Sequence, residues 1–241
     1  MFKYFASSFG LGRMTRIVSL VSGIGLLASA ISSNANQLTT APGFGPWQVG
    51  SGGEFTVTPD AQLAAQLGTY SPFNLNQGGF SGSFQTFCIE RLENIHDNTT
   101  YDVTVTNTTL FSYDPLSAGV AYLYWQFATG QLTDLGGTPY VKPQAYNLQH
   151  ALWYLMNPTM YGGQQDNLYV LKAAAALGGL PAAMAPAGAN NFGVKVLNLW
   201  TPNQPHVAGY SWQDVLIYTV PEPSVFALLS VAGILAFRRR K

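Results

Sequence analysis

YDVTVT at 101–106 and SAGVAYLYWQFATGQL at 117–132 are the two segments that decide the fold of this chain. The first alternates apolar and polar residues, which predicts a half-buried β-strand. The second repeats apolar residues at the helical period, with Ser117 in the N-cap position and Gly130 near the end, which predicts an α-helix. The chain therefore contains both strands and helices, and it changes from one to the other between residues 106 and 117.

The sequence on either side extends this pattern. The same criteria predict four further strands and two further helices: strands at 55–58, 84–90, 194–200 and 215–220, and helices at 143–156 and 166–177. Residues 37–46 are predicted to be a polar leader, and residues 178–193, rich in Ala, Gly and Pro, a long surface loop. Strands followed by helices and then by strands predict an α+β fold, in which an antiparallel sheet or sandwich core carries inserted helices.

The charge of the chain is unevenly distributed. Seven of its 11 cations lie near the two ends, whereas all 11 carboxylates lie between residues 36 and 223. This central part keeps four cations and has a net charge of −7. It offers no basic face, so a nucleic acid partner is not expected. Cys88 is the one cysteine of the chain, so an internal disulfide cannot form.

The first 35 residues have the features of an export signal. Arg13 and Arg16 precede an apolar run at 17–30, and Ser33-Asn34-Ala35 offers a small-x-small cleavage site. We therefore expect residues 1–35 to be a signal peptide with an apolar helix, and residues 36–219 to form one exported domain.

The last 22 residues, 220–241, combine three features in order. Pro221, Glu222 and Pro223 come first, an apolar run at 225–237 follows, and the chain ends in four cations: Arg238, Arg239, Arg240 and Lys241. As a helix, the apolar run spans about 20 Å, which is short of the roughly 30 Å hydrocarbon core of a bilayer. The terminal cations are expected to stay on the cytoplasmic side as the anchor stop.

This tail resembles the PEP-CTERM sorting signal of Gram-negative bacteria. The resemblance implies export and a transient anchor in the inner membrane through a short transmembrane helix. It also implies cleavage by an exosortase as processing partner. The expected final location is the cell surface or the extracellular matrix.

Two internal segments carry the candidate chemistry: Thr86-Phe87-Cys88-Ile89-Glu90 in a predicted strand and Leu148-Gln149-His150-Ala151-Leu152-Trp153 in a predicted helix. They resemble the paired motifs of the thioester domains of Gram-positive surface adhesins. The resemblance implies an internal thioester between the Cys88 sulfur and the Gln149 carbonyl, formed with loss of ammonia. It further implies adhesin-like, single-turnover attachment to an amine or hydroxyl of a surface protein or matrix polymer, which is not enzymatic turnover and uses no cofactor or metal.

Two residues beside the predicted cross-link are candidates to assist it. His150 follows Gln149 directly and is a candidate general base, and Glu90 lies two residues after Cys88. Successive residues of a helix diverge by about 100°, so adjacency in sequence does not make His150 face the bond.

Three other interpretations of these residues stay open. Cys88 is also compatible with a small buried apolar residue in a structural or carbohydrate-binding protein of the exopolysaccharide biofilm matrix. A Cys-His hydrolase would pair Cys88 with His96, His150 or His206. Four carboxylates that follow Cys88 predict either a Ca²⁺ site or, more simply, a solvated acidic turn: Glu90, Glu93, Asp97 and Asp102.

Overall fold

The computed structural model describes residues 36–43, 48–49, 52–70, 82–110, 112–132, 142–189 and 191–220. These residues belong to one compact unit, Ala35–Lys241. The predicted signal peptide at 1–35 and the sorting residues Pro221, Glu222 and Pro223 with the tail after them lie outside this described part. Within it, no helix combines the length and the hydropathy that crossing a membrane requires.

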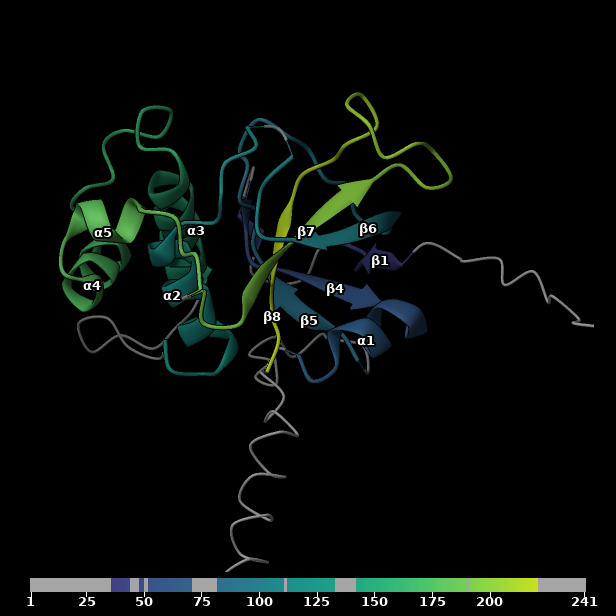
Figure 1. Ribbon diagram of the computed structural model, residues 1–241, viewed down its shortest axis with the longest axis horizontal. Helices are drawn as coiled ribbons and strands as arrows, with labels where there is room; N and C mark the ends of the chain where they lie inside the picture. Colours follow the sequence, from purple (N-terminus) through teal and green to yellow (C-terminus); the bar gives the residue numbers. More distant parts are fainter. Residues whose placement is uncertain are drawn as a thin grey trace, which may run out of the picture. The chain divides into compact units, whose positions relative to one another are not determined.

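The main sheet has six strands, and every neighbouring pair is antiparallel. Its spatial order is β5-β4-β1-β6-β7-β8, and Figure 1 shows the strands in this arrangement. The strands are β1 (Gln37–Thr40), β4 (Phe55–Pro59), β5 (Phe84–Thr86), β6 (Thr100–Thr106), β7 (Val194–Trp200) and β8 (Val215–Tyr218). A separate small hairpin consists of β2 (Gln48–Val49) and β3 (Gly52–Gly53).

The two edges of the main sheet approach each other, so the sheet nearly closes on itself. The Thr86 hydroxyl on β5 donates to the Leu216 carbonyl on β8 at 2.6 Å and accepts from the Leu216 N–H at 3.0 Å. Directly after β5, Cys88 forms an isolated antiparallel bridge with Val215. We call this contact between the end of β5 and β8 the seam. Closure matters here because it leaves fewer unpaired backbone groups at the sheet edges.

Four helices are inserted between β6 and β7: α2 (Ala118–Ala128), α3 (Lys142–Met156), α4 (Leu168–Leu177) and α5 (Leu180–Met184). They pack on one another, and α2 also contacts β7 and β8 (Figure 1). Ser117 caps α2 by accepting from the Val120 N–H, as its sequence position predicts, and Asn167 caps α4 in the same way through the Tyr169 N–H. The short helix α1 (Ala61–Leu67) packs on β1 and β4.

Both faces of the β7–β8 pair are buried, which divides the core in two. Val196 and Leu216 belong to the cluster that they share with α2, α3 and α4, whereas Leu197 and Ile217 belong to a second cluster inside the nearly closed sheet. The alternation follows from the two-residue period of a strand. Cys88 lies in the second cluster, while its neighbours Phe87 and Ile89 lie in the first.

The predicted α+β class is confirmed, and so is the insertion of helices into an antiparallel sheet. Three local predictions are wrong. The expected leader contains β1, which pairs with both β4 and β6. The expected loop at 178–193 contains α5, which begins after the positive-φ residues Gly178 and Gly179. The strand expected at 84–90 ends at Thr86, because beyond it the chain leaves β4 and meets β8 at the seam.

Candidate functional site

Cys88 is placed by the seam and not by a regular strand. Its bridge to Val215 fixes the backbone, and the next residue, Ile89, donates its N–H to the Asp214 carbonyl at 3.1 Å. This arrangement leaves both backbone polar groups of Cys88 directed at α3. The side chain is 2% exposed and packs among apolar residues of the inner cluster.

Gln149 of α3 meets Cys88 through its side-chain carboxamide. Its Oε1 accepts the Cys88 N–H at 3.2 Å, and its Nε2 donates to the Cys88 carbonyl at 2.6 Å. The side chain is 1% exposed. The structure therefore brings together the two residues that the motif resemblance singles out, although 61 residues separate them in the sequence.

A second backbone donor reaches the same oxygen. The N–H of Gly53, on β3, donates to Gln149 Oε1 at 3.2 Å. Both lone pairs of this carbonyl are thus used, whereas the opposite amide orientation would place an NH₂ group against two N–H donors. The carboxamide orientation is therefore determined by its surroundings.

The two glycines of β3 have different reasons to be glycine. A Cβ on Gly52 would lie 2.6 Å from Trp153 Cη2 and 2.9 Å from Gln149 Cγ, so only glycine lets the hairpin approach α3 this closely. Gly53 has a φ of +105°, a conformation that side-chain-bearing residues rarely adopt. This hairpin was not predicted from the sequence. The signal that could have indicated it is the adjacent pair Gly52-Gly53, a common turn or close-approach pattern.

Trp153 closes the site on the side of α3. It lies one helical turn after Gln149, is 2% exposed, and packs under Gly52. The Arg91 guanidinium lies over its ring at 5.9 Å and at the same distance over Tyr161. This layer of aromatic rings separates Gln149 from solvent and provides the dry environment that an acyl bond to sulfur needs.

His150 lies beside this aromatic layer. Its ring is 4.3 Å from that of Tyr146 and 5.4 Å from that of Trp153. Partial burial, and then the charge of Arg91, lowers the pKa of His150, so the imidazole stays in the neutral form that accepts a proton. Side chains of successive helical residues diverge by about 100°, and the ring contacts of His150 are with Tyr146 and Trp153.

Burial raises the pKa of the Cys88 thiol well above its usual range. The sulfur therefore stays protonated, in contrast to the thiolate that a Cys-His hydrolase uses as nucleophile. A thioester carries no charge, so the same apolar surroundings that penalise a thiolate do not penalise this bond.

Glu90, predicted to assist the bond, belongs to a buried carboxyl pair instead. Its Oε1 accepts the Ser112 N–H at 3.4 Å, and it interacts with Asp214, which is fully buried. Burial and then the nearby Glu90 raise the pKa of Asp214 to about 9, while the Leu110 N–H, 2.6 Å from its Oδ2, acts against the shift. Glu90 and Asp214 belong to the two segments that form the seam, and their side chains hydrogen-bond to each other there.

The other candidates from the sequence lie apart from one another. His96 packs against the Trp212 ring at 5.0 Å, and His206 stacks on Trp200 at 5.0 Å. Asp102 is buried and accepts from Gln37 and the Asn203 N–H, so the expectation of a solvated acidic turn is wrong for Asp102 and Glu90. Over the described ranges, no group of three metal-ligating side chains comes together.

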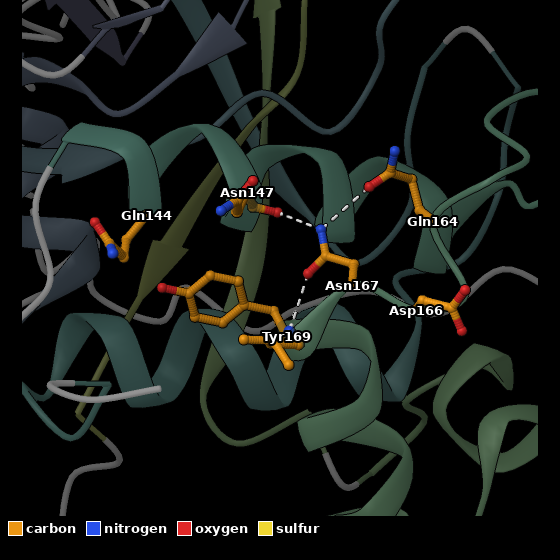
Figure 2. A pocket seen from close by; sticks show the side chains of 7 residues that line it. Gln144, Asn147, Gln164, Asp166, Asn167 and Tyr169 are labelled. Carbon is orange, nitrogen blue, oxygen red and sulfur yellow. Dashed lines mark hydrogen bonds between the residues drawn. The ribbon is translucent and has the colours of Figure 1, made fainter. Parts of the chain in front are cut away.

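A second feature is a polar hollow of about 280 Å³ between the start of α3 and the start of α4. Figure 2 shows Asn167 at its centre, where the side chain donates to Gln164 Oε1 and to the Asn147 carbonyl and accepts from the Tyr169 N–H. The hollow is lined mainly by carboxamide groups together with Asp166. Neutral groups that both donate and accept suit a polyhydroxylated ligand better than an ion.

Comparison with known proteins gave no match: no family model, no curated protein and no solved structure matches this chain. The geometry of the site is therefore the basis for assigning a function.

Proposed function

We propose that this domain forms an internal thioester between Cys88 and Gln149 and uses it once, to attach covalently to a nucleophile on a partner surface. The observation that carries the proposal is the direct, buried contact of the Gln149 carboxamide with the Cys88 backbone. In the reaction the sulfur bonds to Gln149 Cδ, the Cδ–Nε2 bond breaks, and the thiol proton leaves with the nitrogen as ammonia. The acyl group is then activated towards an amine or hydroxyl.

The hydrogen bond from Nε2 to the Cys88 carbonyl supports an amine as acceptor. Attack by a primary amine gives an amide, which restores a nitrogen at this position and stays neutral. Attack by water gives a carboxylate instead, which would be buried with its charge facing the Cys88 carbonyl. The surroundings therefore oppose hydrolysis and favour transfer to nitrogen.

We further propose that the chain is exported and sorted by its tail to the surface or extracellular matrix of a Gram-negative cell. The support is the order of Pro221, Glu222, Pro223, the apolar run and the terminal cations in the sequence. An exposed location fits single-turnover attachment, because the acceptor then lies outside the cell that makes the protein.

The decisive measurement is the intact mass of the purified, folded protein before and after treatment with methylamine. We expect a mass one ammonia below that of the sequence, which methylamine converts to an adduct while one thiol becomes titratable. A small amine is the right probe because Cys88 and Gln149 are almost completely buried. Cys88→Ala serves as control and should keep the full sequence mass throughout. An unmodified wild-type mass would exclude the thioester and leave Cys88 as an inert core residue.

A second candidate function is non-covalent binding of a matrix carbohydrate, which the polar hollow of Figure 2 favours. The side chain of Asn147 is exposed at the hollow, whereas its backbone carbonyl holds Asn167. Asn147→Ala therefore removes a ligand-facing carboxamide and leaves the cap of α4 in place.

For this candidate we expect Asn147→Ala to weaken binding of exopolysaccharide by about 5- to 20-fold, the loss of one or two hydrogen bonds. Affinity electrophoresis in gels that contain the polysaccharide measures the effect, with unchanged thermal unfolding as the check on folding. If the polysaccharide retards the variant and the wild type equally, the hollow is not a sugar-binding site.

A further inference from the structure

The N–H groups of Gly53 and Cys88 converge on one atom, and this convergence has a chemical meaning beyond holding Gln149 in place. Each donor lies 3.2 Å from Gln149 Oε1, and the two come from elements 35 positions apart in the chain, the β2–β3 hairpin and the seam. Two fixed backbone donors on one carbonyl oxygen are the geometry that acyl-transfer sites use.

We propose that the Gly53 and Cys88 N–H groups form an oxyanion hole that promotes both formation and aminolysis of the Cys88–Gln149 bond. This inference rests on the proposed thioester. When the Cys88 sulfur adds to Gln149 Cδ, the carbonyl π electrons move to Oε1, and the negative charge develops where both donors point. The charge returns to the carbonyl as Nε2 leaves with the thiol proton, so the step releases only ammonia.

The local structure explains why the N–H groups of Gly53 and Cys88 are available to bind Gln149 Oε1. β5 ends at Thr86, so the Cys88 N–H is no longer part of the β4–β5 ladder. Gly53 is the last residue of its two-residue strand, and its φ of +105° turns its N–H towards α3. The dry surroundings strengthen the effect, because hydrogen bonds to a developing charge gain most where water is excluded.

Gly52 has a positioning role in this arrangement. The Gly52 Cα packs directly against Trp153 and Gln149 Cγ, where no side chain would fit. This close packing determines the distance between the Gly53 N–H and Gln149 Oε1. A methyl group at residue 52 would move the hairpin away from α3 and withdraw one of the two donors.

The test replaces the Gly53 N–H by oxygen and changes nothing else. Cell-free translation of the full chain with glycolic acid at residue 53 keeps the backbone conformation and removes the donor. The matched control carries the same replacement at Gly43, which also has a positive φ (+64°) and also donates its N–H to a side-chain oxygen at 3.2 Å, that of Asp97, away from the site. Denaturation with ammonia restores the Gln149 carboxamide and the thiol, and ammonia loss is then followed by intact mass during refolding.

We expect the replacement at residue 53 to slow ammonia loss by about 100-fold or more, the usual effect of removing one oxyanion donor, with the Gly43 control at the wild-type rate. The rate of thiol release by methylamine should fall in parallel. If the residue-53 variant loses ammonia and releases its thiol at rates within about threefold of the wild type, the oxyanion hole is excluded and the thioester is not. A wild-type chain that loses no ammonia overturns the thioester and the inference together.

A second pair of variants tests the inference if the chain with an ester bond at residue 53 does not fold. Gly52→Ala displaces the hairpin, while Gly119→Ala also creates a clash below 3 Å, at 2.9 Å from the Ala183 carbonyl, in α2 and away from the site. We expect both to lower the melting temperature, and only Gly52→Ala to slow the chemistry. Equal rates for the two variants would contradict the inference.

Discussion

Gln149→Ala is expected to lower the free energy of unfolding by about 3–5 kcal/mol, a large share of the stability of a domain of this size. The comparison is made in the Cys88→Ala background, where no thioester can form and Gln149 keeps its carboxamide. There the substitution leaves three backbone groups without their partner in a site closed to water: the N–H of Gly53, the N–H of residue 88 and the carbonyl of residue 88. An unsatisfied buried polar group costs about 1–3 kcal/mol, and partial relaxation reduces the sum. Urea denaturation followed by tryptophan fluorescence measures the change.

Gln85→Ala is the matched control for this prediction. Gln85 is the same residue type with the same 1% exposure, but its carboxamide makes one hydrogen bond, from Nε2 to Thr56 Oγ1 at 3.2 Å. We expect a loss of about 1–2 kcal/mol for this variant. A comparable loss in both variants would show that burial of a glutamine, and not its link between hairpin, seam and α3, determines the cost.

The stability of the domain is expected to fall as pH rises from about 4 to 9, because of Asp214. The folded state raises the pKa of this carboxyl from 3.8 to about 9, so between these values the folded protein binds a proton that the unfolded chain has lost. The contribution of this group is therefore fully present below pH 4, declines across the window, and is lost above pH 9. Burial of the carboxyl, and then the neighbouring charge of Glu90, explain the direction of this pKa shift.

Asp214→Asn tests this prediction with an isosteric change. The asparagine oxygen can still accept the Leu110 N–H, while the buried charge can no longer form. We expect the variant to match the wild type at pH 4 and to be about 2–4 kcal/mol more stable at pH 8. Urea titrations at both pH values measure the difference. Parallel pH profiles of variant and wild type would contradict the assigned shift.

The regular elements of the fold were predictable because each carries its own local signal. The alternation at 101–106 corresponds to β6 within one residue, and the capped, periodic segment at 117–132 corresponds to α2, which begins as predicted but ends at Ala128, four residues early. β1 and α5 were missed for physical reasons. β1 is four residues long, and its strand character comes from pairing with β4 and β6 and not from its own pattern. α5 follows two glycines and contains Pro181, signals that ordinarily favour a loop.

Some residues of the candidate site were likewise predictable from the sequence, and others were not. Cys88 and Gln149 were identifiable from the paired segments, but the contribution of Gly53 was not, since a backbone N–H has no sequence signature. The same holds for the carboxyl pair. Glu90 and Asp214 are 124 positions apart in the chain, and only the seam brings them together. Interactions made by backbone groups, or by residues joined through closure of the sheet, require the three-dimensional structure.

The seam also determines when the proposed chemistry can begin. Gly53 and Gln149 are 96 residues apart, Cys88 and Gln149 are 61 apart, and Thr86 and Leu216, which hold the seam, are 130 apart. Contacts of such long range form after local helices and hairpins during folding. The C-terminal strand β8 must arrive before Cys88 is in place, so a chain still in transit, or still incomplete, has no reactive acyl group. If the thioester forms as proposed, the domain becomes reactive only after β8 has closed the sheet.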